Sequence, residues 1–187
     1  DGLLSVAGEA TVVMLQPGLQ DRAYLLERLT EERLVCGLIS LVSYMAPLPG
    51  EARAPGISWW FPPLSPSPFS GHSHRVEPLV RALNQAGCPA KIVRDVRETI
   101  AFASALFMPL IAALEVASWS FEKLRKTEAL TLASRGGFQA SALAAPGRRR
   151  WLAWLISRPW LLGTLVRIAP RFVPFDLEIY LRVHFTK

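Results

Sequence analysis

Cysteine, histidine and charged residues are all scarce in this sequence of 187 residues. The two cysteines, Cys36 and Cys88, lie far apart with no further cysteine or histidine at ligand spacing, which excludes a disulfide framework and a zinc motif. We therefore expect no metal site and two reduced thiols, as in a cytoplasmic protein. Charged residues make up 19% and hydrophobic residues 51%, a balance that excludes intrinsic disorder and supports a sizeable core.

No apolar run reaches the length of about 20 residues that a membrane-spanning helix needs. The longest uncharged window, 99–114, has sixteen residues and contains Pro109, and a second window, 151–169, is interrupted by Arg158, Pro159 and Arg167. We interpret both windows as core or interface helices. Because the mean hydropathy of +0.26 is high for a soluble domain, membrane association is kept as the alternative. We also expect no secretory signal, because no basic stretch followed by a short apolar stretch and a cleavage site is found.

The net charge of +6 includes one cluster, the arginines at 148–150. A nucleic-acid-binding chain has a wider basic stripe with aromatic residues between the charges, so we expect no nucleic-acid partner. We interpret the cluster as a solvated helix start. Because Trp151, Trp154 and Trp160 follow it, a helix that docks on a membrane surface or on a partner is the alternative.

Strand and helix signals alternate up to residue 94. β-Branched or continuous apolar runs predict strands, and apolar residues at helical spacing predict helices. The predicted strands are 11–15, 33–44 (buried on both faces), 57–61 and 91–93. One predicted helix begins at Asp21, and a second spans 74–86 with Gly87 just past its end. The four prolines in 62–71 predict a loop, because proline lacks the donor that a sheet interior needs. Such alternation indicates a partly parallel sheet covered by helices.

From Asp95 onward the sequence has only helical patterns. The predicted helices are 95–119, kinked at Pro109, then 121–133, 148–157, 161–168 and 176–187, with breaks at Gly136-Gly137 and Pro146-Gly147. This change predicts an α+β fold with a domain boundary between an α/β part, 1–94, and an all-α part, 95–187.

The turn Gln16-Pro17-Gly18 follows the first predicted strand directly. Open α/β sheets bind ligands beyond the carboxyl ends of their strands, so Gln16 and Gly18 are candidates for contact with a cofactor. An ordinary connection between a strand and a helix is the alternative.

An ordered set of short motifs is similar to those of a known family. The motifs are Val12-Val13-Met14-Leu15-Gln16-Pro17-Gly18, Val35-Cys36-Gly37-Leu38-Ile39, Ala86-Gly87-Cys88, Arg94-Asp95-Val96-Arg97, Met108-Pro109-Leu110-Ile111-Ala112 and Glu178-Ile179-Tyr180-Leu181. With this set the chain resembles a divergent member of the ketopantoate reductase (2-dehydropantoate 2-reductase) family. The resemblance implies that 1–94 is the second half of a Rossmann-like cofactor domain. It implies that 95–187 is an all-α substrate and dimerisation domain of the 6-phosphogluconate dehydrogenase C-terminal type.

The resemblance further implies NADPH as the cofactor, a small keto-acid or other carbonyl substrate, and a homodimer. The sequence has no G-x-G-x-x-G motif, which predicts that the phosphate-binding half lies upstream and that this chain is a fragment. Pro17 stands where the family has asparagine, and Met108 replaces another family asparagine. The lysine that acts as the family's general acid has no counterpart between Asp95 and Glu122. Loss of a general acid costs about 10²–10⁴ in rate.

Glu178 is the one catalytic candidate that the resemblance carries over, because a glutamate there contacts the substrate in the family. Its alternative is a solvent-facing carboxylate that pairs with Arg182 at i,i+4. The sequence thus leaves three hypotheses open: the C-terminal part of an NADPH-dependent keto-acid reductase, a non-catalytic pseudoenzyme or binding module, and a membrane-surface or partner-docking helical protein. Aromatic residues that could line a cleft are Trp59, Trp60, Phe61, Phe102 and Phe107.

Overall fold

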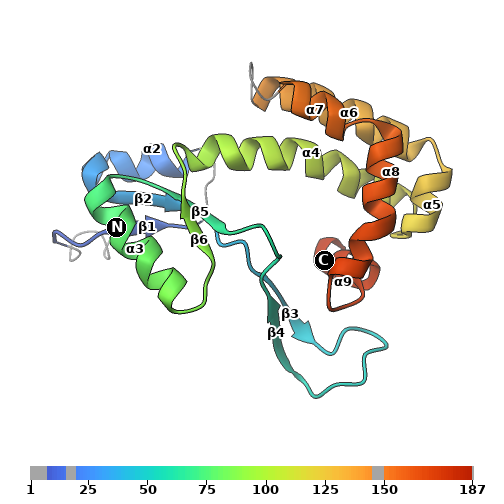
Figure 1. Cartoon of the computed structure of the whole chain (residues 1–187), viewed down its shortest axis with the longest axis horizontal. Helices are drawn as coiled ribbons and strands as arrows, with labels where there is room; N and C mark the ends of the chain where they lie inside the picture. Colours follow the sequence, from blue (N-terminus) through green and yellow to red (C-terminus); the bar gives the residue numbers. More distant parts are fainter. Residues whose placement is uncertain (1–7, 16–19, 145–149, 187) are drawn as a thin grey trace. The chain divides into compact units, whose positions relative to one another are not determined.

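The computed structural model describes residues 8–15, 20–144 and 150–186. The chain forms two compact units, an α/β unit (1–42 and 59–99) and a helical unit (43–58 and 100–187). Figure 1 shows the elements of both units along the chain. The predicted turn at 16–18 and the predicted break at Pro146-Gly147 lie outside the described residues.

A mixed four-stranded sheet forms the centre of the α/β unit, in the order β1-β2-β5-β6. Its strands are β1 (Val12–Met14), β2 (Leu34–Gly37), β5 (Ser67–Ser70) and β6 (Ala90–Ile92). β1 and β2 are parallel, β5 and β6 are parallel, and β2 and β5 are antiparallel. Helix α2 (Asp21–Leu26) with the turn η1 (Glu31–Arg33) joins the first pair, and α3 (Ser73–Gln85) joins the second. The predicted partly parallel sheet is therefore confirmed.

Helix α3 covers one face of this sheet. Val35, Phe69 and Ala90 of the strands pack there against Val76 and Val80 of the helix. The helix ends as the sequence predicts. Gly87 has a φ of 78°, and the N–H groups of Gly87 and Cys88 donate to the carbonyls of Asn84 and Leu83, which is a Schellman cap.

The prediction that 62–71 is a loop is wrong at its C-terminal end, because residues 67–70 form the central strand β5. Ser67 N–H donates to the Pro89 carbonyl on the β6 side, so the missing donor of Pro68 faces the β2 side. There β2 has already ended, and Pro68 contributes only its carbonyl, which accepts from Leu38 N–H at 3.0 Å. Proline thus removes no donor that the ladder uses.

The predicted single strand 33–44 is two strands. β2 is buried throughout, as predicted, but the chain then leaves the sheet and forms β3 (Val42–Ala46), which pairs with β4 (Gly56–Trp60) in a separate ribbon. The tip of the ribbon, 43–58, belongs to the helical unit. Tyr44 of β3 lies 5.1 Å from the Phe175 ring and 5.9 Å from the Tyr180 ring, measured between centroids.

Only helices follow β6 in the described residues, as predicted. They are α4 (Val96–Val116), α5 (Phe121–Lys126), α6 (Ala129–Ala144), α7 (Arg150–Ile156), α8 (Pro159–Ile168), the turn η2 (Ala169–Phe172) and α9 (Leu177–Phe185). The predicted helix 121–133 is therefore divided between α5 and α6. Leu114 and Leu124 are fully enclosed in the core of this unit.

Gly136-Gly137 does not break the chain, which corrects the prediction from sequence. Both glycines lie inside α6. A Cβ at Gly137 would lie 3.6 Å from the Leu106 carbonyl oxygen, and a Cβ at Gly136 would lie 3.5 Å from Pro109. The two glycines therefore allow α6 to approach the backbone of α4 closely.

Helix α4 holds the apolar window 99–114. Among the described residues it is the one helix with the length and composition to cross a membrane, a test that core helices of soluble proteins also pass. The interpretation of this window as a core or interface helix stays a prediction.

Candidate functional site

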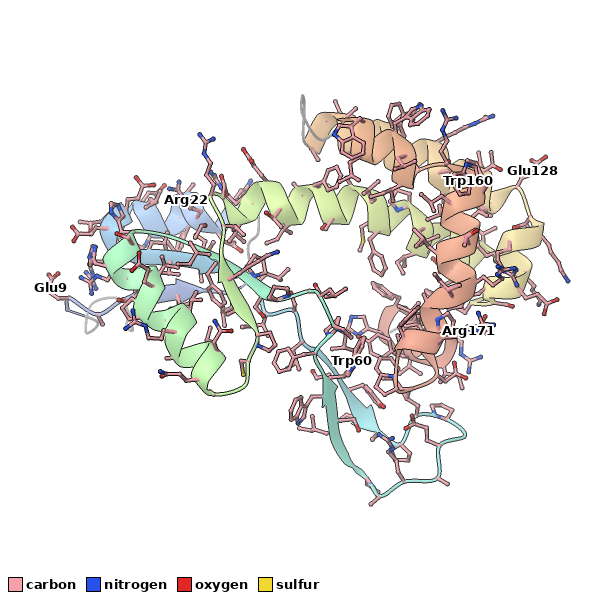
Figure 2. The ribbon with its side chains drawn as sticks, in the orientation of Figure 1. Glu9, Arg22, Trp60, Glu128, Trp160 and Arg171 are labelled. Atoms are coloured by element: carbon pink, nitrogen blue, oxygen red, sulfur yellow. The ribbon has the colours of Figure 1, made fainter. Side chains whose placement is uncertain are left out.

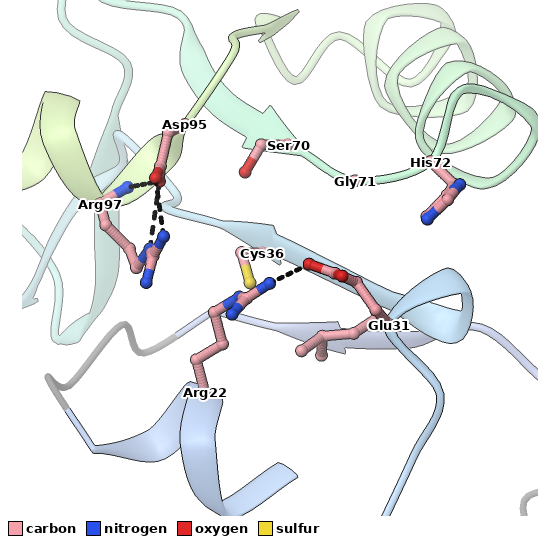
Figure 3. A pocket seen from close by; sticks show the side chains of 9 residues that line it. Arg22, Glu31, Cys36, Ser70, Gly71, His72, Asp95 and Arg97 are labelled. Carbon is pink, nitrogen blue, oxygen red and sulfur yellow. Dashed lines mark hydrogen bonds and ion pairs between the residues drawn. The ribbon is translucent and has the colours of Figure 1, made fainter. Parts of the chain in front are cut away.

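A polar pocket of about 330 Å³ lies in the α/β unit, near the carboxyl ends of β5 and β6 (Figure 3). Leu34 and Cys36 alternate with Val35 along β2, so the pocket lies over the sheet face opposite the one that α3 covers. Its lining comes from five elements and the loops between them: Arg22, Glu31, Leu34, Cys36, Ser70, Gly71, His72, Asp95 and Arg97.

Both guanidinium groups of this pocket are paired with carboxylates. Arg22 of α2 pairs with Glu31 of η1. Arg97 Nη2 lies 2.9 Å from Asp95 Oδ2. The backbone N–H of Arg97 donates to Asp95 Oδ1 at 2.8 Å, and this hydrogen bond caps the first turn of α4. The hydrogen bond from the Arg97 side chain holds the pKa of Asp95 below its usual range. The pocket is therefore polar and close to charge-neutral.

The thiol of Cys36 points into this pocket from the middle of β2 (Figure 3). Burial raises the pKa of Cys36, and the guanidinium groups of Arg22 and Arg97 oppose that shift without reversing it. The thiol is therefore protonated at neutral pH, which is the unreactive form. The arrangement suits the binding of a small polar molecule better than nucleophilic chemistry.

Glu178, the catalytic candidate, lies in the helical unit in the first turn of α9. Asp176 caps this helix, with Oδ1 accepting from Ile179 N–H at 2.9 Å. The Glu178 carboxylate accepts a hydrogen bond from the backbone N–H of Phe121, the first residue of α5. It therefore contacts a helix end and does not form the ion pair with Arg182 that the sequence offered as the alternative.

A second pocket, of about 380 Å³, contains Glu178. Two arginines from other helices line it, Arg125 of α5 and Arg167 of α8. Arg125 Nε donates to the Phe121 carbonyl at 3.3 Å, which fixes the direction of its side chain. Two guanidinium groups share this pocket with three carboxylates, those of Glu122, Asp176 and Glu178. Guanidinium groups bind an acidic group and a carboxylate accepts from a hydroxyl, so the set can hold a molecule that carries both.

The aromatic residues proposed to line a cleft belong to different units. Trp59 and Phe61 lie in the α/β unit, where their rings meet edge to face at 5.8 Å. Phe102 and Phe107 line an apolar cavity of about 320 Å³ inside the helical unit.

The cofactor-binding candidates Gln16 and Gly18 lie outside the described residues. Gly37 of β2 and Gly71, which follows β5, offer no phosphate cradle. A Cβ at Gly37 would meet the Phe69 ring at 2.3 Å, and one at Gly71 would meet the Leu34 carbonyl oxygen at 3.1 Å. Both positions face protein atoms and so offer no room for the pyrophosphate of NADPH.

The sequence analysis missed Arg22, Cys36 and Arg97 as pocket residues. Asp95 and Arg97 follow β6 directly, and a charged pair just beyond a strand end is a signal that could have found them. No cluster of three metal-ligating side chains occurs in the described ranges. Comparisons of the chain with protein-family models, with curated proteins and with solved structures returned no match.

Proposed function

We propose that this chain is the C-terminal part of a reductase of 2-keto acids, similar to the ketopantoate reductase family, in which it supplies the substrate-binding surface. The order of elements supports this proposal. Two strand–helix–strand units form a mixed sheet, and α4 leads from the last strand into a purely helical region. A Rossmann-like origin for the sheet and a 6-phosphogluconate dehydrogenase type for the helices are part of the same proposal, as is a homodimer.

One observation carries the proposal, namely the pocket that holds Glu178 together with Arg125 and Arg167. A 2-keto acid carries a carboxylate, and a guanidinium group is the side chain that binds a carboxylate best, through paired N–H donors. The second carboxylate oxygen of Glu178 is available to accept a hydrogen bond from a substrate hydroxyl. These residues bind and orient a substrate; NADPH would supply the hydride and would be held by residues other than those described.

A pseudoenzyme is the second candidate function, and two observations favour it. Helix α4 contains no lysine, so the proton donor that the resemblance implies has no counterpart there. Glu178 also satisfies a backbone donor of α5, which is a sufficient structural reason for the residue.

The decisive experiment is NADPH oxidation by the native gene product with a panel of 2-keto acids. We expect turnover, and we expect Arg167→Ala to raise KM for the keto acid, because the variant removes a carboxylate partner. Arg171→Ala is the matched control, since Arg171 lies four residues further along the chain, in η2, and does not line the pocket.

Failure to reduce any keto acid or aldehyde, with NADPH still bound, would establish the pseudoenzyme. Turnover with an unchanged KM in Arg167→Ala would remove this pocket from substrate binding. Light scattering checks the homodimer, and a monomeric mass at working concentration would contradict it.

A further inference from the structure

The charge of this chain is concentrated in one acid-free region. Between Glu128 and Asp176 the sequence contains no aspartate or glutamate, while it contains seven arginines. These are Arg135, Arg148, Arg149, Arg150, Arg158, Arg167 and Arg171. A region with one sign of charge over this length attracts a partner of the opposite sign.

Three tryptophans of the same region are exposed to solvent. Trp151 is 65% exposed, Trp154 is 49% exposed and Trp160 is 67% exposed. Trp151 and Trp154 are three residues apart in α7 and so lie on one face of that helix. Trp160 is the second residue of α8, and Arg171 lies past the other end of that helix, in η2 (Figure 2). Exposed indole rings among cations are typical of proteins that lie at the interface between a bilayer and water.

Arginine and tryptophan meet directly at one place on this surface. Arg135 of α6, Trp154 of α7 and Arg158, which precedes α8, line a hollow of about 370 Å³ with a mostly apolar wall. The guanidinium carbon of Arg158 lies 3.6 Å from the centroid of the Trp154 ring. Neither arginine has an acidic partner in the described part of the chain. We name Arg135, Trp151, Trp154 and Arg158 the Arg–Trp surface.

We propose that the Arg–Trp surface docks the protein on the surface of an anionic phospholipid bilayer. The guanidinium groups would bind lipid phosphates, and the indole rings would enter the headgroup region. Charge selects this occupant over a second copy of the chain, since two copies of an acid-free arginine surface repel each other. The proposal does not depend on the proposed reductase function, and it takes up the membrane-surface alternative that the sequence left open.

The test is co-sedimentation of the chain with vesicles at low salt. Vesicles of phosphatidylcholine alone are compared with vesicles made of equal parts of phosphatidylcholine and phosphatidylglycerol. We expect binding to the anionic vesicles only, and we expect it to weaken as salt is added. Arg135→Glu with Arg158→Glu should reduce this binding at least about tenfold, because each basic residue near the bilayer contributes severalfold.

Each variant has a matched control in the α/β unit. Arg81→Glu with Arg94→Glu makes the same change of charge at exposed positions, and binding should stay within about twofold of the unmodified chain. Trp151→Ala should weaken binding, whereas Trp59→Ala, which removes an indole of 66% exposure from β4, should not. Circular dichroism confirms that each variant is folded, and Trp151→Ala keeps the test valid if the double arginine variant does not fold.

Four results would overturn the proposal. The first is absence of binding to the anionic vesicles. The second is equal binding to both kinds of vesicle. The third is binding that the Arg–Trp variants and their controls reduce alike. Binding to single-stranded nucleic acid in preference to anionic vesicles would also overturn it, and would assign the surface to a different anion.

Discussion

Replacement of Glu178 separates its structural contribution from any catalytic one. The N–H of Phe121 is at the first position of α5, where no carbonyl of the helix can accept from it, and Phe121 itself is buried. Glu178→Ala leaves this donor without a partner. The expected loss is about 1–2 kcal/mol of unfolding free energy, or a decrease of ~2–8 °C in Tm. Glu178→Gln keeps a side-chain carbonyl acceptor, so its loss should stay below about 0.5 kcal/mol.

Urea unfolding, followed by circular dichroism, measures both variants against Glu115→Ala, which removes an exposed carboxylate of α4. If Glu178→Ala is as stable as Glu115→Ala, the hydrogen bond to α5 does not contribute and our reasoning about this residue is wrong. If Glu178→Gln keeps its stability and loses turnover of a keto acid, the charge of Glu178 acts on the substrate rather than on the fold.

Three further predictions concern packing and pH. Gly37→Ala should destabilise the α/β unit by about 1–3 kcal/mol or more in urea unfolding, because its Cβ would lie 2.3 Å from the Phe69 ring. Recovery of stability on adding Phe69→Leu checks this cause, and an unchanged urea midpoint in Gly37→Ala would contradict the prediction. The pKa of Asp95 is lower in the folded chain than in the unfolded chain because Arg97 donates to it, so the pair stabilises the fold above the unfolded pKa and loses that effect as pH falls through the folded pKa. Asp95→Asn should therefore flatten the acidic part of a stability-against-pH curve, and a parallel curve would refute this. Gly137→Ala should be neutral or stabilising by up to about 1 kcal/mol, whereas Gly137→Leu should force α6 from α4 and lower Tm. Equal Tm values for the two variants would show that the helices are not in close contact.

The local signals in the sequence predict local structure well. Apolar spacing with a terminal glycine predicts α3 and its cap at Gly87, and the helix predicted over 176–187 corresponds to α9, which Asp176 caps. Strand β5 was missed because the cost of Pro68 depends on which side of the strand its missing donor faces. That side is set by the ladder with β2, which lies 30 residues earlier in the chain and whose register local sequence does not reveal.

The candidate pockets were less predictable than the fold. Arg22, Cys36 and Asp95 are far apart in the sequence, and only the sheet topology brings them together. Glu178 was found through a family resemblance, but its contact with α5 depends on helix packing that no motif describes. Gly136-Gly137 was misinterpreted for the same reason, since a glycine that permits close helix packing and a glycine that ends a helix look identical in sequence.

The helical unit is discontinuous along the chain, since it includes the ribbon tip 43–58 as well as 100–187. A single cut near residue 95 would therefore not release it intact. A fragment that begins there would lack Tyr44, and the rings of Phe175 and Tyr180 that Tyr44 touches would meet water instead. A helical fragment with its full set of contacts therefore needs residues 43–58 as well as 100–187.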